Sequence, residues 1–270
     1  MSREKKSGVR PKKALGQHFL HDQHTARKIV ESLLIPEGTT LRLLEIGPGM
    51  GVLTRLLKGG GRTELTVIEI DRESVAWLKE HKLVEESRII EGDFLKTDLS
   101  QIFTGHFSII GNFPYNISSQ IFFRVLDHRN QVDQVVCMLQ KEVAERIASP
   151  HGSKVYGILS VLLQAYYDVQ MLFKVSPGVF TPPPNVMSAV IRLVRNSRQK
   201  LDCDERLFVQ VVKQGFNNRR KTLRNALKNL NLAGAVSSLP LLDKRAEQLT
   251  VEEFIHLTRL IEDSRAGTPD

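Results

Sequence analysis

LLEIGPGMGVLT, residues 43–54, is the stretch that decides the expected fold. It joins a short apolar run to an amphipathic segment through a turn that holds Gly47, Gly49 and Gly51. Glycines at this spacing permit a tight turn and let a ligand approach the backbone where a helix begins. Val52 stands where the dinucleotide fingerprint has its third glycine, which disfavours a nicotinamide dinucleotide as the ligand. We therefore predict a buried strand over residues 41–46, a ligand-binding turn and a helix over residues 51–58.

Short apolar runs alternate with amphipathic segments over most of the chain. We predict strands over residues 64–70, 88–91, 106–110, 134–139, 166–173 and 186–194, and helices over residues 22–34, 73–82, 118–126, 142–148 and 157–165. This alternation is typical of a mostly parallel sheet with helices on both faces.

Only helical patterns follow the polar linker that begins at residue 195. They span residues 204–215, 219–230 and 250–263, and Thr250 and Glu253 form a capping box for the last of them. We therefore place a domain boundary at residue 197. The expected parts are an α/β domain over 1–197, whose residues 1–13 form a basic, flexible tail, and a small all-helical domain over 198–270.

Acidic residues end the two strands that follow the glycine turn. Glu69 closes the strand in LTVIEIDRES, and Asp93 follows the next strand in IIEGDF. A carboxylate at the first position can accept hydrogen bonds from both hydroxyls of a ribose, and one at the second can accept from the amine of adenine. Each residue alone could equally be a helix cap or a surface charge. Together with the turn they predict an adenosine pocket, and since no Walker pattern or phosphate-binding lysine accompanies it, the expected ligand is S-adenosylmethionine.

GNFPYN, residues 111–116, follows the apolar run at 106–110. Pro114 cannot donate to a ladder, so the strand must end near it, at the edge where open α/β sheets bind ligands. The stretch resembles the (Asp/Asn)-Pro-Pro-(Tyr/Phe) signature of methyltransferases that act on adenine N6 or cytosine N4. The side-chain oxygen of Asn112 and the carbonyl of Phe113 can accept the two N–H bonds of an exocyclic amine, and Tyr115 can stack on a flipped base. A plain structural turn is the alternative.

The composition excludes several classes of protein. With 41% hydrophobic and 25% charged residues, the 270-residue chain has the balance of a soluble globular protein. No run approaches the ~18 consecutive apolar residues of a membrane span, and the N-terminus lacks the apolar core of a secretory signal. The two cysteines, Cys137 and Cys203, lack the spacing of metal ligands, so we expect a reduced cytoplasm and no structural metal.

Positive charge is concentrated in two segments. Residues 1–13 carry a net charge of +5 and residues 195–228 one of +7, whereas the whole chain carries +8. Two such basic segments favour a polyanion as partner, and nucleic acid fits best. A solvated face and a disordered tail are the alternative.

The chain resembles the KsgA (RsmA) family of small-subunit ribosomal RNA adenine dimethyltransferases. The resemblance is carried by KKALGQHFL at 12–20, EIGPGMGVLT at 45–54, VIEIDR at 67–72, EGDF at 91–94, GNFPYNISS at 111–119, MLQKEVAERI at 138–147, VFTPPPNV at 179–186 and FNNRRKTLRNAL at 216–227. It implies a Rossmann-like S-adenosylmethionine-dependent methyltransferase domain followed by a helical domain that contacts RNA. The implied reaction transfers four methyl groups to the N6 atoms of two adjacent adenosines near the 3′ end of 16S rRNA, in a cytoplasmic enzyme that is monomeric when free.

The resemblance also implies roles for individual residues. The cofactor contacts would be His18, Leu20, Gly47, Gly49, Glu69, Asp93 and Asn112; the catalytic residues Asn112, Phe113, Tyr115 and Phe180; and the RNA contacts Lys12, Lys13, Arg219, Arg220, Lys221 and Arg224. His18 departs from the family, which commonly has Asn after LGQ, and Phe113 stands where Leu is usual. Phe180 would be the second aromatic wall for the target base, or else an ordinary buried residue before a proline-stiffened turn.

Two other functions fit parts of this pattern. One is a large-subunit rRNA adenine methyltransferase of the resistance type, which shares the catalytic motifs but usually lacks the basic stretch at 216–227. The other is a non-catalytic RNA-binding assembly factor that retains the fold.

Overall fold

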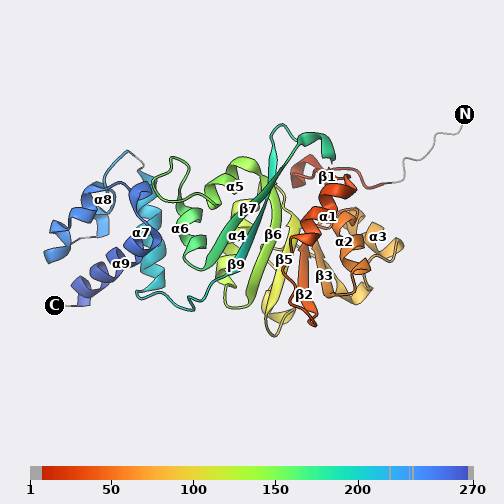
Figure 1. Cartoon of the computed structure of the whole chain (residues 1–270), viewed down its shortest axis with the longest axis horizontal. Coiled ribbons are helices and arrows are strands. Elements are labelled where there is room, and N and C mark those ends of the chain that lie inside the picture. The colour runs from red at the N-terminus through yellow and green to blue at the C-terminus, as the bar shows by residue number, and fades with distance from the viewer. Residues whose placement is uncertain (1–7, 219, 231, 233, 267–270) are drawn as a thin grey trace, which may run out of the picture. The chain divides into compact units, whose positions relative to one another are not determined.

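A computed structural model describes residues 8–218, 220–230, 232 and 234–266 (Figure 1). Its main feature is a seven-stranded sheet in the order β4-β3-β2-β5-β6-β9-β7. The strands are β2 (Leu41–Ile46), β3 (Thr63–Glu69), β4 (Ile89–Glu91), β5 (Phe107–Asn112), β6 (Val132–Gln140), β7 (Tyr167–Val175) and β9 (Ser188–Arg195). From β4 to β6 neighbouring strands pair in parallel, and β9 pairs with β6 antiparallel. The mostly parallel sheet predicted from the sequence is therefore confirmed.

The central strands form where the chain is mostly apolar. Leu43, Leu44, Ile109 and Ile110 are completely buried, as expected of strands that are covered on both faces. The helices that accompany them are α1 (Gln23–Glu31), α2 (Val52–Gly59), α3 (Arg72–Glu80) and α4 (Ser118–Asp127), and Figure 1 shows α1, α2 and α3 next to one another beside β2 and β3.

The strand order places a binding site at one edge of the sheet. The chain passes from β2 outward to β3 and β4, and then returns to the other side of β2 as β5. A ligand of an open α/β sheet binds at such a switch point, beyond the carboxyl ends of the strands. The ends of β2, β3 and β5 carry Gly47, Glu69 and Asn112, so the candidate residues converge there.

A short antiparallel pair that the sequence analysis missed joins two distant segments. Strand β1 (Phe19–Leu20) pairs with β8 (Phe180–Thr181), and Leu20 lies opposite Phe180. Both side chains belong to the apolar core beneath the sheet.

The chain forms two compact units. One comprises the described residues up to Ala144 together with Gln170–Arg195, and the other comprises Glu145–Val169 and the described residues from Asn196 onward. The boundary predicted at residue 197 instead assigns residues 145–169 to the first domain. The predicted division into a methyltransferase domain and an RNA-contacting domain stays a prediction.

The second unit is built mainly of helices. It holds the C-terminal end of α5 (Lys141–Ile147), from Glu145 onward, together with α6 (Ile158–Gln164), α7 (Glu205–Asn217), α8 (Leu223–Ala226) and α9 (Val251–Ala266). The capping box predicted for α9 is present, since the backbone N–H of Glu253 donates to Thr250 Oγ1 at 3.0 Å and that of Thr250 to Glu253 Oε2 at 2.8 Å. The rings of Phe216 and Phe254 stack 6.0 Å apart between α7 and α9.

The continuous helix predicted over residues 219–230 is wrong. Helix α8 covers only Leu223–Ala226, and Lys228–Leu230 form a separate 3-10 turn. Thr222 has an extended backbone with ψ 160°, and the N–H of Lys221 donates to the carbonyl of Asn218 at 2.8 Å in a tight turn. The apolar stripe of the predicted helix nevertheless packs inward, because Leu223, Leu227 and Leu230 are buried.

Short 3-10 turns complete the described chain. Besides Lys228–Leu230 they are Lys13–Leu15, Glu86–Arg88, Leu99–Gln101, Pro177–Val179, Gly234–Ser238, Pro240–Asp243 and Ala246–Gln248. No helix among the described residues combines the length and the hydropathy needed to cross a membrane.

Candidate active site

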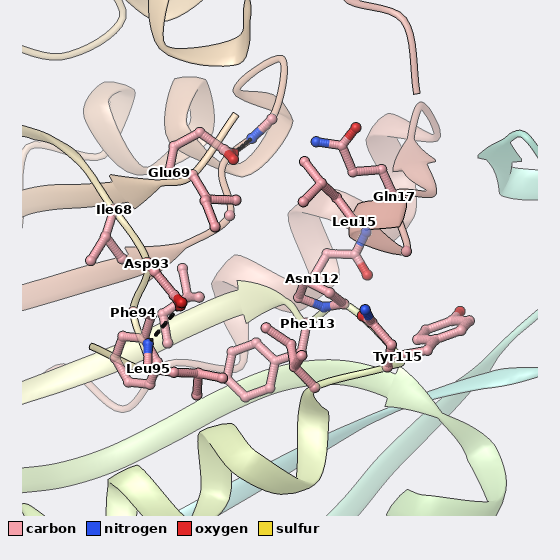
Figure 2. A pocket seen from close by; sticks show the side chains of 18 of the residues that line it. Leu15, Gln17, Ile68, Glu69, Asp93, Phe94, Leu95, Asn112, Phe113 and Tyr115 are labelled. Carbon is pink, nitrogen blue, oxygen red and sulfur yellow. Dashed lines mark hydrogen bonds between the residues drawn. The ribbon is translucent and has the colours of Figure 1, made fainter. Parts of the chain in front are cut away.

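A pocket opens at the carboxyl edge of the sheet, where the strand order reverses. Its walls come from residues 14–19, the turn at Gly47 and Gly49, and the segments 68–70, 92–95 and 112–117. Figure 2 shows the side chains of Glu69 and Asp93 on one side of the pocket and those of Asn112 and Gln17 on the other.

The glycine turn is shaped for close approach. Gly49 has a φ of 53°, and a Cβ atom there would lie 2.8 Å from the ring of Phe19. Gly47 has a φ of 64°, and a Cβ atom there would meet nothing within 4 Å. Since Gly47 lines the pocket, this open space belongs to whatever the pocket binds.

Glu69 is only 4% exposed, and two backbone hydrogen bonds hold its side chain in place. Its carboxylate accepts hydrogen bonds from the backbone N–H of Gly49 at 3.0 Å and from that of Asp71 at 2.9 Å. Burial raises the pKa of Glu69, and the N–H groups of Asp71 and Gly49 oppose this shift. Each oxygen keeps accepting capacity toward the pocket, which suits a diol.

Asp93 is positioned in a similar way. Its Oδ1 accepts a hydrogen bond from the backbone N–H of Leu95 at 2.9 Å, which fixes the carboxylate at the pocket wall (Figure 2). The apolar side chains of Ile68, Ile70 and Phe94 line the same region of the pocket. An acceptor beside apolar walls suits the edge and the faces of an adenine ring.

Asn112, the last residue of β5, is held by the N-terminal segment. Its Nδ2 donates to the backbone carbonyl of His18 at 2.9 Å. Because a carbonyl can only accept, this contact directs the amide nitrogen to His18 and leaves Oδ1 as an acceptor. In the part of the chain that the structure describes, neither Asn112 Oδ1 nor the carbonyl of Phe113 receives a hydrogen bond. The site therefore presents two adjacent unpaired acceptors.

Phe113 and Tyr115 flank these acceptors differently. Phe113 is 1% exposed, its ring packs edge-on against Phe122, and the residue contributes to the pocket wall. The hydroxyl of Tyr115 lies 2.5 Å from Ser188 Oγ, and burial raises the pKa of this hydroxyl. The ring stacks on His18, with centroids 5.4 Å apart.

The side chains of three of the expected residues make contacts elsewhere, although His18 also lines the pocket. His18 contributes its carbonyl, while its Nδ1 lies 2.7 Å from the carbonyl of Pro182. Leu20 and Phe180 are 4% and 2% exposed and face each other in the core. The structure thus places the ring of Phe180 in the core, and the aromatic partner of Tyr115 is His18.

The sequence analysis missed a connection that closes the pocket on one side. Lys12 pairs with Asp71, and also with Glu73 at 3.1 Å. Gln17 donates to Asp71 Oδ2 at 3.3 Å and accepts from the backbone N–H of Lys12 at 2.8 Å. We call residues 12–18 the N-terminal strap. The sequence feature that could have indicated this connection is Asp71, two positions after Glu69. An aspartate at the start of a helix predicts only a helix cap, and Asp71 does also cap α3.

A second buried acid, Glu45, lies beneath the glycine turn. It is 1% exposed and accepts a hydrogen bond from Thr54 Oγ1 at 2.7 Å. Burial raises the pKa of Glu45 to about 8, opposed by the hydrogen bond from Thr54 and reinforced by the charge of Glu69. The carboxyl is therefore protonated near neutral pH and ties β2 to the first turn of α2.

A family model described as ribosomal RNA adenine dimethylase matches residues 8–263 of the chain. The chain belongs to this family.

Curated relatives extend the match over nearly the whole protein. A protein of Cytophaga hutchinsonii named ribosomal RNA small subunit methyltransferase A is 55% identical over 253 residues, which are 94% of this chain and 98% of the relative. A protein of the same name from Parabacteroides distasonis is 57% identical over 251 residues, 93% of each chain.

Two solved structures share the fold. A dimethyladenosine transferase from Plasmodium falciparum aligns with a TM-score of 0.75 at 25% identity, covering 93% of this chain and 98% of its own. The 23S rRNA methyltransferase ErmE aligns with a TM-score of 0.65 at 26% identity, covering 89% of this chain and 99% of its own. The Rossmann-like fold expected from the sequence is thereby confirmed, and the family is of the kind that uses S-adenosylmethionine.

The side chains expected to contact RNA in this dimethylase differ in whether they already form ion pairs within the protein. Lys13, Arg220 and Lys221 are exposed. Lys12 is engaged by Asp71, and Arg224 pairs with Asp243 at 2.8 Å and also donates to the carbonyl of Ser237. Arg219 lies outside the described residues, as do residues 1–7 of the expected basic tail. Among the described residues, no cluster of three or more His, Cys, Asp and Glu side chains could hold a metal ion.

Proposed function

We propose that this protein is an S-adenosylmethionine-dependent enzyme that dimethylates N6 of two adjacent adenosines near the 3′ end of 16S rRNA in the small ribosomal subunit. The observation that carries the proposal is the pair of unpaired acceptors, Asn112 Oδ1 and the carbonyl of Phe113, at the edge of a pocket that also holds Glu69 and Asp93. Membership of the adenine dimethylase family supports the same reaction.

The residues of the pocket fit S-adenosylmethionine. Glu69 would accept from the ribose hydroxyls, Asp93 from the adenine amine, and Gly47 would admit the ligand close to the backbone. When bound, S-adenosylmethionine supplies an electrophilic methyl group on a sulfonium ion.

The catalytic work of the chain is to orient a weak nucleophile. The lone pair of an exocyclic adenine amine is delocalised into the ring, so the nitrogen attacks poorly while it stays planar. Acceptors at Asn112 Oδ1 and at the Phe113 carbonyl would bind its two N–H groups, which favours a pyramidal nitrogen with its lone pair free to attack. Because the acceptors are already held in place, by the contact of Asn112 with His18 and by the backbone turn, little reorganisation is needed.

Tyr115 would hold the base that carries the amine. Its hydroxyl is fixed by Ser188 and its ring borders the pocket, so one aromatic face is available for stacking. The same face stabilises positive charge that develops on the ring during methylation.

The small subunit is favoured over the large subunit as the substrate particle. The relatives at 55% and 57% identity are named small-subunit methyltransferases, whereas the 23S enzyme ErmE is 26% identical. As part of the same proposal, the enzyme acts in the cytoplasm and is a monomer when free.

A single assay separates the proposal from its alternatives. The purified protein is given radiolabelled S-adenosylmethionine and either small subunits that lack the two dimethyladenosines or naked large-subunit RNA. We expect label in the N6 positions of small-subunit RNA. Label in the large-subunit RNA alone would favour the resistance type, and binding to small subunits without transfer would favour an assembly factor.

A further inference from the structure

A second hollow adjoins the cofactor pocket at Tyr115. It is bounded by residues of the segment 11–18, by Tyr115 and Gln140, and by the loop 182–186, and we call it the proline hollow. Its volume is about 540 Å³, within the range of roughly 300–1,000 Å³ that small-molecule sites occupy. Gly16, Gln17, His18 and Tyr115 line both the hollow and the cofactor pocket, so the two sites are contiguous.

The lining of the hollow combines an apolar platform with a few polar groups. The platform consists of the exposed prolines Pro182 and Pro183, and of Val186, whose side chain is exposed although apolar. Apart from the polar residues that it shares with the cofactor pocket, its polar side chains are those of Lys13, Gln140 and Asn185. Within the described part of the chain none of these three forms a hydrogen bond or an ion pair.

This chemistry suits a nucleotide. Flat apolar surfaces take the face of a base, neutral amides can donate to and accept from its edge, and a single cation can pair with one phosphate. Acidic side chains, which would repel RNA, are missing from the residues that line the hollow.

The position of the hollow identifies which nucleotide it takes. His18 stands between the two sites, since its ring stacks on Tyr115 and its Nδ1 contacts the carbonyl of Pro182. A carbonyl can only accept, so Nδ1 carries the proton and donates, and in the neutral ring Nε2 is then an acceptor. Because the two sites share this aromatic pair, a base in the hollow would lie next to a base whose amine faces Asn112, as the adjoining nucleotide of a strand does.

We propose that the proline hollow binds the nucleotide adjacent to the target adenosine, with its base on the Pro182–Pro183 platform, its edge at Gln140 and Asn185, and its phosphate at Lys13. This inference rests on the proposed function and adds a site that reads the second nucleotide of the pair. The enzyme therefore selects its target adenosine together with a neighbour.

The test uses reconstituted small subunits with altered 16S transcripts. Either the 5′ or the 3′ adenosine of the pair is replaced by uridine, and the rate is measured per remaining adenosine. For the wild-type enzyme we expect one of the two replacements to lower kcat/KM about 10-fold, because a stacked and hydrogen-bonded base is lost. The variant Gln140→Ala/Asn185→Ala should show a similar loss on subunits reconstituted with the unaltered, unmethylated transcript, and no further loss on the sensitive substrate.

Controls separate reading of the neighbour from damage to the enzyme. Asn130 is an exposed amide that lies two residues before the start of β6, whereas Gln140 is the last residue of that strand. The variant Asn130→Ala should therefore behave as wild type. Affinity for S-adenosylmethionine should be unchanged in the double variant. Lys13→Gln should lower the salt slope of subunit binding by about one unit, as expected for one lost phosphate contact.

Two results would overturn the inference. One is a double variant that methylates subunits reconstituted with the unaltered transcript at the wild-type rate. The other is a loss of rate in the double variant that multiplies with the loss from the base replacement, which would make the two losses independent. Failure of the wild-type enzyme to methylate subunits with the unaltered transcript would instead contradict the proposed function.

Discussion

Lys12 lies in the most basic stretch of the N-terminus, yet its ammonium group is held by Asp71, whose side chain is only 1% exposed. Burial alone would raise the pKa of Asp71, but hydrogen bonds from Lys12, Gln17 and Ser74 hold it below its usual value. Asp71 also donates its backbone N–H to Glu69 at 2.9 Å. The N-terminal strap is thereby connected through one carboxylate to the proposed ribose-binding acid.

The first prediction separates Lys12 from its neighbour Lys13. Lys12→Ala should weaken S-adenosylmethionine about 2- to 5-fold, because an ion pair that holds the N-terminal strap against the pocket is lost. Lys13→Ala should leave cofactor affinity unchanged. Calorimetry on both variants measures this difference, and equal cofactor affinities would mean that Lys12 does not contribute to the pocket.

The convergence of Glu69, Asp93 and Asn112 could be predicted from the sequence. Their strands are short apolar runs, and the ends are marked by glycine or proline beside Asp93 and Asn112 and by the charged Asp71 after Glu69, so the order of elements brings those ends to one edge. No packing detail is needed for this inference.

The directions of side chains in irregular segments could not be predicted. His18 directly precedes a two-residue strand pair and Phe180 belongs to it, and the register of this pair decides which side chains face the core. Such a short pair has no periodicity in the sequence. Similarly, the heptad-like spacing at 219–230 fits a helix, and only the turn at Asn218–Thr222 separates Arg220 from the helix that holds Arg224.

The second prediction concerns Glu69. Glu69→Ala should weaken S-adenosylmethionine by about 1–3 kcal/mol, because charge-assisted hydrogen bonds to the ribose are lost. Calorimetry measures the affinity, and circular dichroism verifies that the variant is folded. An unchanged affinity in the folded variant would remove Glu69 from the site.

The third prediction is a pH dependence of stability that originates at Glu45. Its pKa is about 8 in the folded state against an ordinary value of 4.5, so between these values the folded protein keeps a proton that the unfolded chain has released. Stability therefore falls as pH rises through this window, by up to about 1.4 kcal/mol per pH unit.

Glu45→Gln keeps an acceptor for Thr54 but does not titrate. Urea unfolding from about pH 5 to 7.5 should show a flatter decline in the free energy of unfolding for this variant than for wild type. Parallel declines for the two proteins would show that Glu45 is ionised in the fold.

The fourth prediction distinguishes two kinds of basic residue in the C-terminal unit. Arg220→Gln combined with Lys221→Gln should weaken RNA binding and flatten its salt dependence by roughly two units, one for each lost phosphate contact. Arg224→Gln should change the salt slope less, because its guanidinium already pairs with Asp243. Binding isotherms over a salt series measure the slopes, and an unaltered slope in the double variant would exclude both residues from RNA contact.

The last prediction tests the acceptor at Asn112. Asn112→Ala should lower the single-turnover rate of methyl transfer by about 10²–10³, as the loss of one preorganised hydrogen-bonding group does in other dry sites. RNA affinity should persist, because the phosphate contacts lie elsewhere.

Asn112→Asp keeps an acceptor for the amine but cannot donate to the carbonyl of His18, so it should restore only part of the rate. Tyr115→Phe is the matched control: it loses the contact with Ser188 but keeps the stacking face, and should retain most activity. A rate near wild type for Asn112→Ala would reduce GNFPYN to a structural turn and make the non-catalytic assembly factor the better description.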